Sequence, residues 1–160
     1  RVQAEEAPAK GGGCRWPTEW DRRQVIPQEV HLEGLSLQPG ARIKVKGFIQ
    51  AAAKLFRINL GKDEQNIGLH FNPRFNYIGD HNVIVCNSRK GDRWGAEQRE
   101  TNFPFEDMRT VEVNFIFEGK QFRVKLPNGH EFTFPNRLEM EEINFLSVYG
   151  DFYVRRVDFE

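Results

Sequence analysis

The sequence has little cysteine, no long apolar run and no excess of one charge. Its two cysteines, Cys14 in a polar leader and Cys86 at the end of an apolar run, do not make a disulfide framework, and we expect free thiols of a reducing compartment rather than a bridge. No stretch approaches the roughly 18 apolar residues of a membrane span, which predicts no direct membrane insertion. Because 23 basic residues balance 23 acidic ones, no global positive field favours nucleic acid.

The first 26 residues differ in composition from the rest. They combine glycine, proline and charged residues without sustained periodicity, so we predict a flexible N-terminal extension at 1–26 and one domain at 27–160. Two indoles, Trp16 and Trp20, leave open the alternative that this segment docks onto a surface. The same segment lacks the apolar run of a secretory signal peptide.

Beyond Val30 the hydrophobic pattern has a period of two. Apolar and polar residues alternate at 43–49, 55–60, 111–118 and 121–126, which is typical of half-buried strands. Turn residues separate these runs, at Pro39-Gly40, Glu118-Gly119-Lys120 and Asn128-Gly129. Short strands spaced in this way predict an all-β fold, either an antiparallel sandwich or a barrel.

One stretch places polar side chains on a single face of a strand. Ile67, Leu69 and Phe71 are expected to point into the core, and the opposite face then carries Gly68, His70, Asn72 and Arg74. A surface strand also carries polar residues for solubility alone. However, His, Asn and Arg at a spacing of two offer more directional donors and acceptors than solubility requires.

The next segments extend this polar surface. Asn87 ends the following strand in phase with Val83 and Val85, Trp94 follows a charged turn, and Glu97 and Arg99 share a face. Three neighbouring strands would therefore present seven such side chains together, namely His70, Asn72, Arg74, Asn87, Trp94, Glu97 and Arg99.

A surface of this kind suits a neutral sugar. Planar amide, guanidinium and carboxylate groups can each bridge two hydroxyls, and an aromatic ring packs against the C–H face of a pyranose. We expect Arg74, Glu97 and Arg99 to hold one another in place by ion pairing, which would organise the site before a ligand arrives.

The residues closely resemble the carbohydrate-recognition motif of the galectins in order and spacing. The resemblance spans about 130 residues, from Val30 to Glu160, and rests on His70-Phe71-Asn72-Pro73-Arg74, Val85-Cys86-Asn87 and Trp94-Gly95-Ala96-Glu97-Gln98-Arg99. It implies a two-sheet antiparallel jelly-roll β-sandwich that binds β-galactosides without metal or other cofactor.

The resemblance also implies residue roles. His70, Asn72 and Arg74 would bond the axial 4-hydroxyl of galactose, Asn87 and Glu97 the 6-hydroxyl, and Trp94 would lie under the ring. Arg74, Glu97 and Arg99 would also reach the neighbouring glucose or N-acetylglucosamine. The partners implied are β-galactoside glycans of glycoproteins and glycolipids, met in the cytoplasm and, after export without a signal peptide, outside the cell.

Two features depart from the family pattern. Ile78 is apolar where many single-domain galectins carry a polar residue near the extended subsite, which bears on fine specificity. The leader of about 26 residues is longer than usual. Single-domain galectins dimerise through edge strands near the chain ends, so we predict a homodimer through Val30–Leu35 and Phe152–Phe159 that the leader could modify.

Catalysis, metal binding and protein binding are the alternatives to sugar binding. Glycoside hydrolysis usually needs two carboxylates, whereas Glu97 is the acidic member of the set and Glu100 has the opposite strand parity, so we predict no catalysis. No metal site is predicted, because the four histidines (His31, His70, His81 and His130) lack ligand spacing. The remaining alternative is a galectin-fold protein that acts mainly through protein–protein contacts.

Overall fold

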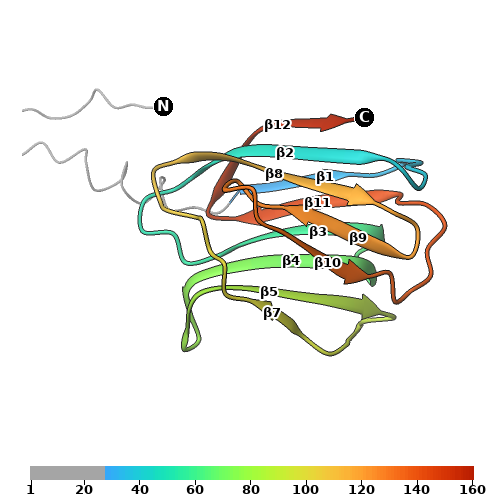
Figure 1. The fold of residues 1–160 in the computed structure, drawn as a ribbon, viewed down its shortest axis with the longest axis horizontal. Coiled ribbons are helices and arrows are strands. Elements are labelled where there is room, and N and C mark those ends of the chain that lie inside the picture. Colours follow the sequence, from blue (N-terminus) through green and yellow to red (C-terminus); the bar gives the residue numbers. More distant parts are fainter. Residues whose placement is uncertain (1–27) are drawn as a thin grey trace, which may run out of the picture.

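The protein is a sandwich of two antiparallel sheets (Figure 1). The computed structural model describes residues 28–160; the segment predicted as an extension, 1–26, lies outside the described residues together with Cys14. The seven-stranded sheet contains, in spatial order, β1 Gln28–Leu32, β11 Phe145–Gly150, β3 Phe56–Asp63, β4 Asn66–Tyr77, β5 Asp80–Lys90 and β6 Arg93–Trp94, with β7 Gln98–Glu100 also paired to β5. The five-stranded sheet contains β10 Glu131–Pro135, β9 Gln121–Lys125, β8 Thr110–Phe117, β2 Arg42–Ile49 and β12 Phe152–Phe159. The predicted sandwich is confirmed.

Phenylalanine fills the space between the two sheets. Phe56 of β3 stacks on Phe152 of β12 with ring centroids 4.5 Å apart, and Phe71 of β4 meets Phe115 of β8 edge-on at 5.3 Å. All four rings are fully buried, and each burial contributes about 1.5–3 kcal/mol. The core therefore holds β3 and β4 firmly from behind, which leaves their other face available for a ligand.

The strand β4 contains a bulge that the period-two pattern does not reveal. Ile67 pairs with Arg89 and His70 with Asn87, so β4 has one more residue than β5 between these pairs. A methyl group at Gly68 would meet Met140 and Phe122 on the core side, while Ile67, although buried, lines the outer groove described below. The prediction that Ile67 points into the core and Gly68 away from it is wrong, because one extra residue reverses the alternation.

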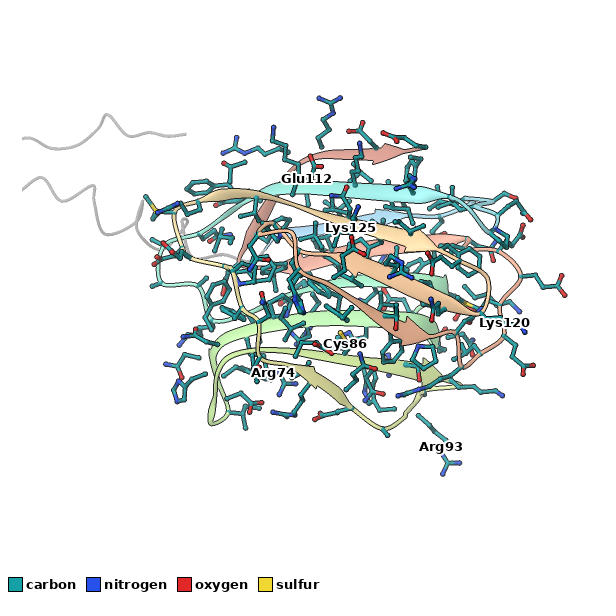
Figure 2. The ribbon with its side chains drawn as sticks, in the orientation of Figure 1. Arg74, Cys86, Arg93, Glu112, Lys120 and Lys125 are labelled. Carbon is teal, nitrogen blue, oxygen red and sulfur yellow. The ribbon has the colours of Figure 1, made fainter. Side chains whose placement is uncertain are left out.

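Cys86 lies on the core side of β5 and is fully buried (Figure 2). It is a free thiol, as expected, and burial raises its pKa, so the thiol stays protonated at neutral pH.

Two strands near the chain ends form sheet edges. β1 borders the seven-stranded sheet and β12 borders the five-stranded sheet, so both strands expected to mediate dimerisation have an unpaired edge within the described chain. Among residues 28–160 there is no helix whose length and apolarity would let it cross a membrane.

Candidate carbohydrate-binding site

A groove of about 520 Å³ crosses the outer face of the seven-stranded sheet. The three strands β4, β5 and β6 lie side by side and supply most of its wall. Six of the seven predicted side chains line the groove, and the seventh, Arg99, is bonded to Glu97 at its rim. The structure therefore brings together all of the predicted residues: His70, Asn72, Arg74, Asn87, Trp94, Glu97 and Arg99.

His70 is held in one orientation by two residues behind it. Its Nδ1 lies 2.7 Å from Oδ1 of Asn59, and the amide of Asn59 donates to the hydroxyl of Ser147 at 3.1 Å. The Asn59 oxygen thus accepts from a protonated Nδ1, which leaves Nε2 as an acceptor. Burial, and then the charges of Arg57, Arg74 and Arg89, lower the pKa of His70 to about 3. The ring is neutral at physiological pH.

Asn72 and Arg74 are locked to each other. Arg74 donates from Nε to Oδ1 of Asn72 at 2.9 Å, and the Asn72 amide donates to the backbone carbonyl of Phe56 at 2.9 Å. With Asn72 only 2% exposed, the pair is fixed on a rigid strand. The guanidinium plane of Arg74 thereby stays in the groove wall.

Asp80 is the carboxylate that joins the two arginines of the site. It accepts from Nη1 of Arg74 at 2.6 Å and from Nη1 of Arg99 at 2.9 Å, and Arg99 also pairs with Glu97 at 2.9 Å. These hydrogen bonds, from Arg99 first, lower the pKa of Asp80 to about 2. The expectation that Arg74, Glu97 and Arg99 pair among themselves is therefore wrong for Arg74, whose partner is Asp80.

Asn87 is positioned by a residue from a distant loop. Its amide donates to the carbonyl of Gly95 at 3.0 Å, and its oxygen accepts from the backbone of Ser88 and from Arg137 at 3.3 Å. Arg137 also donates to the Ser88 hydroxyl. The sequence pattern did not identify Arg137 as part of the site.

Trp94 presents an open aromatic surface to the groove. The indole is 49% exposed, lies 4.6 Å from the His70 ring and is flanked by the guanidinium of Arg89 at 5.3 Å. The preceding residue, Arg93, points away from the body of the molecule, as Figure 2 shows. An indole so exposed between polar groups suits a ligand with one apolar face.

The acidic groups near the groove are more numerous than the sequence indicated. Glu64 lines the groove along with Glu97, so Glu97 is not its single acidic residue. Glu100 faces the other way, as expected, since it accepts from Gln98 and Gln98 reaches Thr133 in the five-stranded sheet.

Within residues 28–160 no cluster of three or more His, Cys, Asp or Glu could hold a metal ion.

Comparison with known families accounts for this arrangement. A family model described as galactoside-binding lectin matches residues 28–159. The chain belongs to this family. Galectin-1 of sheep (Ovis aries) is 55% identical over 126 residues, which are 79% of this chain and 93% of the sheep protein, and galectin-1 of goat (Capra hircus) is 56% identical over the same shares.

Solved structures of galectins share the fold of this family member. CG-16, a homodimeric agglutinin from chicken liver, superposes with a TM-score of 0.80 and 46% identity, covering 83% of this chain and all of the chicken chain. A complex of toad ovary galectin with thio-digalactose gives a TM-score of 0.80 and 40% identity, covering 82% and 98% of the two chains.

Proposed function

We propose that this lectin-family protein binds β-galactosides in the groove, without a metal ion and without catalysing a reaction. One observation carries the proposal. His70, Asn72 and Arg74, whose polar groups are fixed by hydrogen bonds, line the same groove as the exposed indole of Trp94. A galactose presents an axial hydroxyl and an apolar C–H face to such a site.

Each side chain has a role that fits its bonding. Nε2 of His70 accepts from the 4-hydroxyl, and Arg74 donates to the same oxygen from the guanidinium that Asn72 orients. Asn87 and Glu97 bind the 6-hydroxyl. Trp94 packs under the ring, while Arg74, Glu97 and Arg99 reach the sugar attached at C1.

Relatives of the chain support this assignment. The toad ovary galectin was solved with thio-digalactose and with N-acetylgalactose, and each of these structures covers 82% of this chain. Six of the seven side chains line one groove and the seventh, Arg99, pairs with Glu97 at its rim, which does not favour the alternative of a galectin-fold protein that acts mainly through protein contacts.

The proposed binding of β-galactosides also indicates the biological partners. The protein would cross-link β-galactoside glycans of glycoproteins and glycolipids as a homodimer formed through the β1 and β12 edges. The homodimeric chicken agglutinin, with the same fold, supports this assembly. We place the protein in the cytoplasm and outside the cell.

Titration calorimetry with lactose tests the proposal. The wild type should bind, Trp94→Ala should lose roughly 1–3 kcal/mol, by analogy with bases stacked on aromatic residues, and Trp94→Phe should lose less. Arg93→Ala is the matched control, because Arg93 precedes Trp94, projects away from the body of the molecule and does not line the groove. No heat with lactose, or release of free galactose on incubation, would contradict the proposed function.

A further inference from the structure

Two apolar side chains project from the surface outside the groove. Ile78, in the turn between β4 and β5, is 79% exposed, and Met108, in the segment that leads from β7 to β8, is 60% exposed. These are the largest exposed fractions among the large apolar side chains of residues 28–160. Neither side chain belongs to the core, and neither lines the groove. Packing and galactose binding therefore do not account for the apolar character of these two positions.

The backbone at both positions has a positive φ, 45° at Ile78 and 63° at Met108. A β-branched residue such as isoleucine rarely adopts this conformation, whereas asparagine adopts it more readily than other residues that have a side chain. Both the turn and the surrounding water therefore favour a polar residue at position 78. An apolar residue there points to contact with a partner.

The two side chains lie at the same end of the sandwich, where Figure 1 shows the β2–β3 loop, the β4–β5 turn and the segment before β8 together. The β2–β3 loop is bonded to both of its neighbours. The carbonyl of Lys54 accepts from the amide of Asn76 at 3.2 Å. The amide of Ala52 donates to the carboxylate of Asp107 at 2.9 Å. We call this surface the loop end, and it comprises residues 50–55, 77–79 and 105–109.

The charges of the loop end are balanced. Its two cations, Lys54 and Arg109, are matched by two carboxylates, Glu106 and Asp107. Arg109 pairs with Glu106 at 3.3 Å. A surface without net charge has no electrostatic preference for an anionic lipid or another polyanion. What the loop end offers a partner is apolar contact.

The proposed orientation of the sugar directs the remainder of a glycolipid toward the loop end. In the proposed function, Arg99 reaches the sugar attached at C1 of galactose. Arg99 donates to Asp80 at 2.9 Å, and Asp80 pairs with Tyr77 across the two-residue turn that contains Ile78. A group linked to that second sugar would therefore continue beside the turn. In a lactosyl lipid this group is the lipid itself, so the membrane surface would lie at this end.

We propose that the loop end contacts the bilayer when the groove holds the galactoside of a membrane glycolipid. This inference rests on the proposed galactoside binding. Ile78 and Met108 rest in the headgroup region as two separate apolar contacts, which remove from water the apolar area that the isolated protein exposes. The contact is peripheral and requires no membrane-spanning segment.

Cosedimentation of the full chain with neutral phosphatidylcholine vesicles that carry lactosylceramide tests the proposal. The double variant Ile78→Asn with Met108→Asn should bind these vesicles about tenfold more weakly than the wild type. Because asparagine tolerates a positive φ, the variant should fold at least as stably as the wild type. Its affinity for soluble lactose and for lactosylated albumin should stay within about twofold of the wild type, because these ligands present one or many galactosides without lipid.

Two further variants serve as controls. Ile78→Met keeps an apolar side chain and should keep vesicle binding. Glu139→Asn also places asparagine at a positive φ, 54°, but Glu139 lines a hollow with Asn66, at the opposite end of β4, and its replacement should have no effect.

The proposal is overturned if the double variant binds the glycolipid vesicles as tightly as the wild type. It is also overturned if the double variant loses as much affinity for lactosylated albumin as for the vesicles, since the loop end would then not contact lipid. Failure of the wild type to bind soluble lactose would instead reject the galactoside site itself.

Discussion

At the scale of single residues, Arg74 lines the groove and forms an ion pair with the carboxylate of Asp80. Arg74→Ala should nearly abolish lactose binding and leave the fold intact. The substitution removes charged hydrogen bonds of about 1.5–3 kcal/mol each and leaves Asp80 paired with Arg99 alone. Calorimetry measures the affinity, and circular dichroism checks the fold.

Arg74→Lys separates geometry from charge. An ammonium keeps the charge but cannot contact Asn72, Asp80 and a sugar hydroxyl in one plane, so this variant should also be strongly weakened. Wild-type affinity in either folded variant would reject the assignment of Arg74.

His70 gives the site a characteristic pH dependence. Because its folded pKa is about 3, below the ordinary 6.5, Nε2 stays a free acceptor and lactose affinity should be constant from pH 8 to pH 5. The unfolded chain takes up the proton first, so the stability associated with neutral His70 is complete above pH 6.5 and falls as the pH drops from 6.5 toward 3.

Nuclear magnetic resonance titration of the His70 ring tests this directly. The imidazole should remain neutral at pH 5 with its proton on Nδ1, as the contact with Asn59 requires. A midpoint between pH 6 and 7, matched by a loss of lactose affinity there, would contradict the buried acceptor.

The sequence located the groove-lining residues but not the residues that hold them in place. Strand parity predicted His70, Asn72 and Arg74 together, because a period of two decides which side chains share a face. Asp80 was not predicted, because it follows a tight turn in which Ile78 and Gly79 both have positive φ. The period of two does not extend through such a turn, so it does not show which strand face Asp80 adjoins. The contact of Arg137 with Asn87 was not predicted, because 50 residues separate the two in the sequence.

At the scale of elements, the β3–β4 pairing at the bulge depends on a glycine. A methyl group at Gly61 would lie 2.5 Å from the carbonyl oxygen of Asn66 and 2.8 Å from the Cα of Ile67. Gly61→Ala should therefore destabilise the protein by about 1–3 kcal/mol. Urea unfolding should show a lower midpoint with an unchanged m-value.

Gly68→Ala offers the comparison within the same bulge. Its new methyl group would first meet the terminal methyl of Met140, a flexible side chain that can move, so the loss should be smaller than at Gly61. Equal stability of Gly61→Ala and the wild type would contradict the close approach of the two backbones.

The strands were predictable where alternation is regular. Ile43, Val45 and Ile49 are fully buried on β2, as their spacing indicates. The Asn128-Gly129 turn joins β9 to β10, with Gly129 taking the positive φ. The bulge at Gly68 was not predictable, because an inserted residue is recognised from the pairing register and not from one strand.

At the scale of the whole molecule, the unpaired edges of β1 and β12 are the proposed surfaces for dimerisation. Sedimentation at tens of micromolar should show a dimer that agglutinates red cells. Two linked sites can raise apparent affinity by roughly 10²–10⁴ without a new contact. A monomer without agglutination would contradict this, and deletion of residues 1–26 would then show whether the leader blocks the edge.

Recognition of the axial 4-hydroxyl of galactose by the groove is tested most directly by comparing lactose with cellobiose. Cellobiose presents an equatorial 4-hydroxyl, which would leave His70, Asn72 and Arg74 partly unpaired at roughly 1–3 kcal/mol per group. Calorimetry should therefore give lactose an affinity higher by on the order of 10²-fold or more. Equal binding of cellobiose and lactose would contradict recognition of the axial 4-hydroxyl.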